Sequence, residues 1–316
     1  MSFKVGDVEV PRGEKRGGYL EVAEASTHTV KLPYVVAHGS RDGPTLGVLS
    51  GVHGVEWAPV EAVLRLIDSV DASDLSGTLI MLPVVNTEGF HARKSYENTL
   101  DHLNQNRVFP GDPEGSMTKH VAHAVFTSFV ARCTHLVDLH SADLGEDATR
   151  GMFIYRTQDQ GLRDRMLDMA RCFDCDFVET TDIAGNTGEA VNLYGIPCIM
   201  TESGTPYPVR DDDVLYHYLG VKNLMRRLGM LDGEAAQGDP PVDPPTRRVW
   251  AKSGGVWRRR VEAGQRVAEG ELLGTVSSLL GETQQVATSP LRGVISFLRT
   301  SVSVNEGDTL LWVTEA

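Results

Sequence analysis

The chain has 316 residues, of which 41% are hydrophobic, so one large domain or two unequal ones with a buried core are expected. The net charge of -13 and the pI of about 5.2 argue against nucleic acid or an anionic membrane as the main partner, because phosphate binding requires a basic surface. The four cysteines, the polar first 30 residues and the lack of any apolar run near the ~20 residues of a membrane span predict a cytoplasmic protein without disulfides.

Strands and helices alternate from the N-terminus onward. The pattern predicts strands over 30–39, 45–52 and 78–85, with a helix over 57–70 between the second and the third. The third strand is a continuous apolar run, which is typical of a central strand covered on both faces. The polar segment 86–115 follows, and a loop of this length inside a compact domain usually has a functional role.

The alternation continues beyond this loop. The remaining elements predicted for this part of the chain are helices over 118–132, 161–172 and 211–228 and strands over 133–140, 151–155 and 197–200. Alternating strands and helices predict an α/β domain. Its polar residues follow the ends of strands, which is where such sheets bind ligands.

The composition changes at Gly229. Residues 232–246 are rich in proline, glycine and alanine and are predicted to be a linker. From residue 249 onward, short β-type runs alternate with glycine-containing turns, which indicates a small all-β module. We therefore expect an α/β domain over 1–231, a linker over 232–246 and a β-rich domain over 247–316.

The most specific chemical pattern follows the strand over 45–52. That strand ends in glycine and is followed by His53, and Glu56 lies in the first turn of the predicted helix. An imidazole and a carboxylate at this spacing can hold one metal ion, and His140, after another apolar strand, is the best third ligand. Two histidines, one glutamate and an open fourth position are the ligand set of a hydrolytic zinc site. On their own, His53 and Glu56 are equally well interpreted as a surface or capped pair.

Two further carboxylates are candidates for supporting roles. Asp138 precedes His140 by two residues and can orient it through the second ring nitrogen, although a solvated strand-end aspartate is an equally good interpretation. Zinc lowers the pKa of a bound water toward ~7, and hydrolysis then needs a base for the proton. Glu202 ends an apolar strand and is the candidate base, and the alternative is a surface glutamate in a turn.

The long polar loop contains Asn106 and Arg107. Arginine binds a carboxylate through two parallel hydrogen bonds, and asparagine can add a third, so this pair predicts a substrate with a free carboxylate. The alternative is that Arg107 pairs with Asp101 or Asp112 and braces the loop.

A second cation is expected beside the scissile carbonyl, where it would stabilise the oxyanion together with the metal. Arg93 and Lys94 are both near enough in sequence to supply it. We assign this role to Arg93.

Five segments together resemble a known family. They are residues 51–56, 83–90, 103–111, 137–141 and 201–204. Their residues and order resemble those of the succinylglutamate desuccinylase/aspartoacylase family, within the zinc carboxypeptidase-like superfamily. The resemblance implies a mixed sheet flanked by helices in the catalytic domain.

The resemblance also implies residue roles. It implies one zinc ion per chain, held by His53, Glu56 and His140, with Glu202 as general base and acid. It further implies that Asn106 and Arg107 bind the substrate carboxylate. Relatives carry an arginine in the loop before this pair at a spacing that requires a gap here, so Arg93 and Lys94 both remain candidates for the oxyanion cation.

The C-terminal module resembles the β-domain of these deacylases, which is similar to biotinyl/lipoyl carrier domains. Residues 261–267 and 289–295 carry that likeness. A carrier domain needs a lysine at its hairpin tip, and residues 276–288 contain none. We therefore expect the module to be structural, shaping the cleft or forming an oligomer contact. A non-catalytic carrier or binding module is the weaker alternative.

The sequence thus predicts a zinc-dependent amidohydrolase that removes an acyl group from an N-acylated amino acid. Its partner would be this small-molecule substrate, and neither nucleic acid nor a membrane is expected. The alternative is a zinc carboxypeptidase that acts on small peptides, because the chemistry is the same. The acyl group and the amino acid stay open, with acetylated diamino acids, as in ectoine breakdown by similar proteins, as one option. A homo-oligomer is compatible with the sequence.

Overall fold

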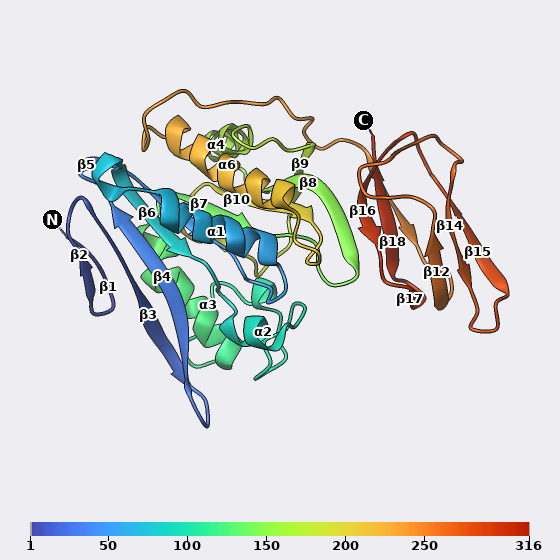
Figure 1. Cartoon of the computed structure of the whole chain (residues 1–316), viewed down its shortest axis with the longest axis horizontal. Coiled ribbons are helices and arrows are strands. Elements are labelled where there is room, and N and C mark those ends of the chain that lie inside the picture. Colours follow the sequence, from blue (N-terminus) through green and yellow to red (C-terminus); the bar gives the residue numbers. More distant parts are fainter. Residues whose placement is uncertain (1, 316) are drawn as a thin grey trace.

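The computed structural model describes residues 2–315 and contains one large mixed sheet (Figure 1). The strands of the N-terminal part are β1 (Phe3–Val5), β2 (Val8–Val10), β3 (Glu14–Glu24), β4 (Thr29–His38), β5 (Arg41–Leu49), β6 (Ser76–Leu82), β7 (His135–Leu139), β8 (Glu146–Tyr155), β9 (Phe177–Thr181) and β10 (Cys198–Gly204). Strands β1 and β2 form a separate two-stranded sheet. The others belong to the large sheet, whose middle runs in the order β8-β10-β7-β5-β6-β4-β3.

Helices flank this sheet. They are α1 (Trp57–Ser69), α2 (Thr87–Ala92), α3 (Met117–Ser128), α4 (Gln160–Ala170), α5 (Glu189–Tyr194) and α6 (Asp211–Arg227). Helices α1 and α6 lie side by side and share a small core of Ala58, Ala62 and Val214 (Figure 1). Strand β6 is buried along almost its whole length, so both faces of the sheet are covered there. The predicted α/β class with a mixed sheet flanked by helices is confirmed.

Four neighbouring strands in the middle of the sheet are parallel. Strand β5 pairs in parallel with β6 on one side and with β7 on the other, and β7 pairs in parallel with β10. The carboxyl ends of β5, β7 and β10 therefore meet at the same edge of the sheet. This is the edge at which open α/β sheets place their ligands.

Some elements differ from the sequence predictions. The predicted loop 86–115 contains the short helix α2, and strand β9 and helix α5 were not predicted. Strand β8 begins at Glu146 rather than at residue 151. Its additional residues pair with Gly204 of β10 and with a strand from the C-terminal part, so the extension depends on distant partners that no local pattern reveals.

The C-terminal part consists of strands with a core of their own, which includes Trp257, Leu273 and Leu298. The strands are β11 (Thr246–Trp250), β12 (Gly255–Arg259), β13 (Arg266–Val267), β14 (Leu272–Ser277), β15 (Thr283–Thr288), β16 (Gly293–Arg299), β17 (Ser303–Val304) and β18 (Thr309–Thr314). Strand β16 pairs antiparallel with β8, with Phe297 opposite Ala148. The large sheet therefore continues from the N-terminal part into the C-terminal part through β8, β16, β18 and β11.

Strands β14 and β15 form an antiparallel hairpin. Its tip carries Leu279 and Leu280, both about nine-tenths exposed, at 87% and 91%. Residues 276–288 contain no lysine, so the hairpin has no amine to which a carrier cofactor is attached. None of the helices within residues 2–315 combines the length and the apolar composition needed to cross a membrane.

Candidate metal centre and active site

Two glycines shape the turn that follows β5. Gly51 has a φ of +61°, and a Cβ there would lie 3.0 Å from the Cα of Val84. At Gly54, a Cβ would lie 2.1 Å from the carbonyl carbon of Gly89, so the turn approaches the backbone of α2 as only glycine permits. These contacts hold the intervening His53, which is 6% exposed, at the carboxyl end of β5.

Glu56 occupies the N-cap position of α1, but its side chain makes no capping hydrogen bond. The carboxylate is 2% exposed and faces two imidazoles instead. Its Oε1 lies 2.6 Å from Nδ1 of His53, and its Oε2 lies 2.9 Å from Nδ1 of His140. One ligand atom from each of the three residues lies within 4.8 Å of the others, so together they could hold one metal ion.

The hydrogen bonding of the two imidazoles fits a metal. His53 Nε2 lies 3.2 Å from Oδ1 of Asn104, an oxygen that also accepts from the backbone N–H of Asn106. His140 Nε2 lies 3.1 Å from Oδ2 of Asp138. Each ring therefore faces an oxygen acceptor at both nitrogens, although a neutral imidazole has only one N–H. With Nε2 as the donor, both Nδ1 lone pairs point toward Glu56, and a single cation there would satisfy all three groups.

The charges of these groups favour the same conclusion. Burial disfavours the charged carboxylate of Glu56, but His140 and His53 outweigh burial and lower its pKa to about 2. Burial also disfavours protonation of His140, yet Asp138 and Glu56 raise its pKa well above the ordinary value. The carboxylates thus stabilise a positive charge between the two rings, which either protons or a metal ion can supply.

Asp138 is fully buried, and its Oδ2 also accepts a 2.8 Å hydrogen bond from the hydroxyl of Thr187. Because this carboxylate can accept from Nε2–H of His140 and so leave Nδ1 free for a metal, Asp138→Asn is expected to weaken the binding of added zinc by about 10- to 100-fold. Competition with a chromophoric chelator measures the affinity. Asp213→Asn is the matched control, since Asp213 is another buried carboxylate but pairs with Arg210. Equal zinc affinity in wild type and Asp138→Asn would contradict the orienting role.

Glu202 extends from β10, next to the strand that precedes His140. Burial, followed by the nearby carboxylate of Glu56, raises the pKa of Glu202 to about 8. Its neighbours Thr201 and Ser203 face the opposite side of the strand. There the hydroxyls of both lie 3.0 Å from ring nitrogens of the buried His217, and burial lowers the pKa of this histidine to about 3. A neutral histidine on α6 therefore fixes the segment of β10 that carries Glu202.

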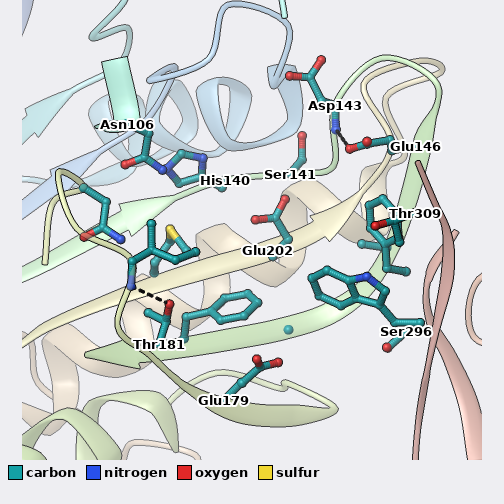
Figure 2. Close-up of a pocket in the computed structure, with 18 of the residues that line it drawn as sticks. Asn106, His140, Ser141, Asp143, Glu146, Glu179, Thr181, Glu202, Ser296 and Thr309 are labelled. Atoms are coloured by element: carbon teal, nitrogen blue, oxygen red, sulfur yellow. Dashed lines mark hydrogen bonds between the residues drawn. The ribbon is translucent and has the colours of Figure 1, made fainter. Parts of the chain in front are cut away.

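A cavity of about 460 Å³ contains the three candidate ligands and Glu202. Asn106 and Arg107 also line it, and the close-up shows Asn106 and Glu202 on different sides of His140 (Figure 2). Within residues 2–315, Arg107 forms no ion pair, and Asp101 instead accepts hydrogen bonds from Thr118. The interpretation of Arg107 as a brace for the loop thus finds no support, and its guanidinium is available to a ligand.

The structure gives Arg93 no place in this cavity. Arg93 caps the C-terminus of α2 in a left-handed conformation with a φ of 53°, and its side chain is exposed. Lys94 is exposed as well, and neither residue belongs to the cavity lining within residues 2–315. The path of the backbone after α2 turns both side chains away from the site, and their position in the sequence does not reveal this path.

Several cavity residues were not identified from the sequence. Tyr96 packs edge-on against the ring of His53, with centroids 4.9 Å apart and an interplanar angle of 84°. Asp143 and Glu146 also face the cavity, and the backbone N–H of Asp143 donates to Glu146 (Figure 2). Burial is the main cause of the raised pKa of both carboxyl groups.

Residues of the C-terminal part complete the wall of the cavity. They are Arg248, Ser296, Phe297, Arg299, Thr309 and Trp312. Their strands reach the cavity because β16 continues the sheet beside β8. Arg299 lies 3.5 Å from Glu146, and the guanidinium of Arg248 lies over the ring of Trp312. The C-terminal β-strands thus form one side of the site, in line with the expectation that this module shapes the cleft, although the sequence did not identify the lining residues.

Fold and site define an α/β protein with a buried His–Glu–His cluster at the carboxyl edge of its sheet, of the kind that binds a metal ion. The profile of the Succinylglutamate desuccinylase/Aspartoacylase catalytic domain matches residues 42–228. The match covers more than half of the chain and includes every candidate ligand as well as Glu202. The chain therefore belongs to the succinylglutamate desuccinylase/aspartoacylase family.

One relative and two solved structures of the same fold are similar to this chain. The chain is 26% identical over 302 residues to the N-alpha-acetyl-L-2,4-diaminobutyric acid deacetylase of Halomonas elongata, covering 92% of this chain and 88% of the relative. The product-bound ectoine utilization protein EutE (DoeB) of Ruegeria pomeroyi has the same fold, with a TM-score of 0.88, 22% identity and coverage of 97% and 98%. A succinylglutamate desuccinylase/aspartoacylase of Rhodobacter sphaeroides has a TM-score of 0.88, 24% identity and 98% coverage of both chains.

Proposed function

We propose that this protein is a zinc-dependent deacylase that hydrolyses the amide bond of an N-acyl amino acid. The observation that carries the proposal is the convergence of His53, Glu56 and His140 in one cavity with Glu202 and Arg107. Membership of the desuccinylase/aspartoacylase family supports the same reaction class. Two imidazole nitrogens and a carboxylate are suitable ligands for zinc and leave a coordination position open.

The proposed mechanism assigns separate tasks to the residues of the cavity. A zinc ion bound by His53, Glu56 and His140 would polarise the carbonyl and lower the pKa of the attacking water. Glu202 takes a proton from that water and returns it to the nitrogen of the leaving amine. Its raised pKa of about 8 makes it a stronger base than an exposed glutamate, and nearby positive charge would bring that pKa closer to neutral.

Arg107 and Asn106 bind the carboxylate of the substrate in this proposal. Asn106 is 5% exposed, and its side-chain amide makes no hydrogen bond within the described residues, so its NH2 group is free to donate to a carboxylate. Nη1 of Arg107 donates to the backbone carbonyl of Asn106. That hydrogen bond holds the guanidinium beside the asparagine. The pair orients the amide by fixing the carboxylate next to it.

The acidic side of the cavity favours an amino acid with a second amine. Asp143 and Glu146 face the cavity near Glu202, and within residues 2–315 Asp143 has no ion-pair partner, whereas Glu146 lies 3.5 Å from Arg299. Carboxylates in such a place can bind an ammonium group, and the relative from Halomonas elongata is named for an acetylated diamino acid. N-acetyl-2,4-diaminobutyrate is therefore the first substrate to test.

The experiment is a screen of zinc-loaded enzyme against N-acyl amino acids that differ in acyl length and in the side chain. N-acetyl-2,4-diaminobutyrate is expected to be hydrolysed faster than N-acetylnorvaline, which has a side chain of similar length without the amine. Small dipeptides are included, because faster cleavage of dipeptides would favour a carboxypeptidase. If the enzyme hydrolyses neither N-acyl amino acids nor dipeptides, the proposed function is contradicted.

Arg107→Ala is expected to raise KM for N-acyl amino acids by about 10- to 100-fold, because a charge-assisted pair of hydrogen bonds is lost. Arg107→Lys keeps the charge but not the paired donors, and an intermediate KM is expected. Steady-state kinetics on an N-acyl amino acid and on its carboxamide separate this role from a structural one. The KM of the acid should differ between wild type and variant, whereas the KM of the carboxamide should not. An equal rise in KM for both substrates would refute carboxylate binding.

A further inference from the structure

The two cations that the sequence offered for the place beside the scissile carbonyl, Arg93 and Lys94, do not line the cavity. The arginines that do line it have other tasks or partners. Arg107 is assigned to the substrate carboxylate, Arg299 lies 3.5 Å from Glu146, and Arg248 lies over the ring of Trp312. Of the segment 87–105, only Tyr96 belongs to the cavity lining, whereas Arg93 and Lys94 are exposed outside it. An amide carbonyl that is attacked by water gains negative charge on its oxygen, and a positioned donor stabilises that charge. Tyr96 is therefore the residue of this loop that is in a position to supply such a donor.

The geometry of Tyr96 fits this task. Its backbone has a φ of 53°, an unusual conformation for a residue with a side chain, and its ring packs edge-on against His53. The hydroxyl donates to Oε2 of Glu146 over 3.2 Å, which is long for an O–H···O bond. Tyr96 lines the cavity, so its side chain is within reach of a ligand there.

We propose that Tyr96 is a catalytic residue whose hydroxyl donates a hydrogen bond to the carbonyl oxygen of the substrate as that oxygen gains charge. The proposal rests on the proposed amide hydrolysis. No covalent bond to Tyr96 forms, and its proton stays on the phenol, which is protonated at neutral pH. Glu146 accepts the hydroxyl when no substrate is bound, and the ring contact with His53 keeps the phenol beside the candidate metal ligands.

Tyr96→Phe removes only the hydroxyl and is expected to lower kcat by about 100-fold with little change in KM, as loss of one oxyanion donor does elsewhere. Tyr218→Phe is the matched control, because the hydroxyl of Tyr218 donates to Ser69 outside the cavity. Zinc content is measured by mass spectrometry and is expected to be the same in wild type and both variants. Arg93→Ala is assayed in parallel and is expected to retain most of the activity.

Binding provides a readout that does not depend on turnover. The probe is the phosphonamidate analogue of N-acetyl-2,4-diaminobutyrate, whose tetrahedral phosphorus carries charged oxygens. Calorimetry is expected to show about 100-fold weaker binding of this probe to Tyr96→Phe than to wild type, in line with the loss of one oxyanion donor. Binding of the product 2,4-diaminobutyrate is expected to be unchanged.

Two results would overturn the role of Tyr96. If Tyr96→Phe matches wild type in kcat and in binding of the phosphonamidate while Tyr96→Ala does not, only the ring contact with His53 matters. If Arg93→Ala loses the rate and Tyr96→Phe does not, the arginine is the donor. A wild-type enzyme that hydrolyses no N-acyl amino acid contradicts the proposed function instead, and the binding comparison still decides on Tyr96.

Discussion

Replacing Glu202 with glutamine is expected to lower kcat by about 100- to 10,000-fold while the protein still binds one zinc ion. Glutamine has nearly the same shape but cannot accept the proton of the attacking water. The neighbouring residues Thr201 and Ser203 remain attached to His217, so the strand should keep its position. Steady-state kinetics on the best N-acyl amino acid, together with zinc analysis of the same samples, provide the measurement.

Glu179→Gln is the matched control, since Glu179 is a second cavity carboxylate with a pKa raised mainly by burial. It lies on β9, a strand that supplies none of the candidate ligands. We expect its kcat to stay within about 10-fold of wild type, because it has no part in proton transfer. Full activity in Glu202→Gln would remove Glu202 from the role of base.

Glu202→Gln is also expected to change the pH dependence of the stability of the metal-free protein. Glu202 has a pKa of about 8 in the folded chain, above the ordinary value of 4.5 for glutamate, so the folded chain binds the proton more tightly. Between these two values, stability should fall as the pH rises, because the unfolded state has already released its proton. Glu202→Gln cannot titrate, and thermal unfolding from pH 5 to pH 8 should show a shallower decline.

The candidate ligands could be predicted because their signals are local. His53 and Glu56 lie in one turn, and His140 follows an apolar strand directly. That these strands are neighbours follows from a general rule, since parallel strands of one sheet place their carboxyl ends at the same edge. The α/β class follows from the alternation of elements in the same way.

Other features of the cavity depend on packing between distant segments. The position of Arg93 depends on the backbone path after α2, and this path is determined by packing between distant segments, such as Gly54 against Gly89. The contribution of Arg248 and Trp312 depends on the pairing of β16 with β8, two strands that are far apart in sequence. Local periodicity contains no information about such pairings. The sequence therefore offered a cleft-shaping role for the C-terminal module as one option, but not the residues that line the cavity.

Two neutral residues that support the site, Asn104 and His217, were not identified from the sequence for a related reason. Asn104 lies in the predicted functional loop, but only the folded chain shows that its Oδ1 lies 3.2 Å from Nε2 of His53. His217 lies within a helix that was predicted from its apolar positions alone. Its ring contacts the hydroxyls of Thr201 and Ser203 on the face of β10 opposite Glu202. Both residues contact side chains of other elements, and residue spacing within one element does not predict such contacts.

Removal of the metal is expected to abolish hydrolysis and to lower the stability of the folded chain, and zinc should restore both. Unfolding separates His53, Glu56 and His140, so zinc should bind the folded chain far more tightly than the unfolded one. At a free zinc concentration 100-fold above Kd, the expected stabilisation is about 2.7 kcal/mol. Thermal unfolding at several zinc concentrations, with a chelator as reference, measures it.

Glu56→Gln tests whether the cluster is the binding site. Glu56 is 2% exposed and is the negative charge shared by both imidazoles, so glutamine should remove the zinc-dependent shift in unfolding temperature as well as the activity. His120→Gln, on α3 outside the cavity, should keep both. A full zinc-dependent shift in Glu56→Gln would mean that the ion binds elsewhere. Without the ion at this cluster, Glu202 and Arg107 would surround a cavity with no group to activate the water, and the proposed hydrolysis would fail.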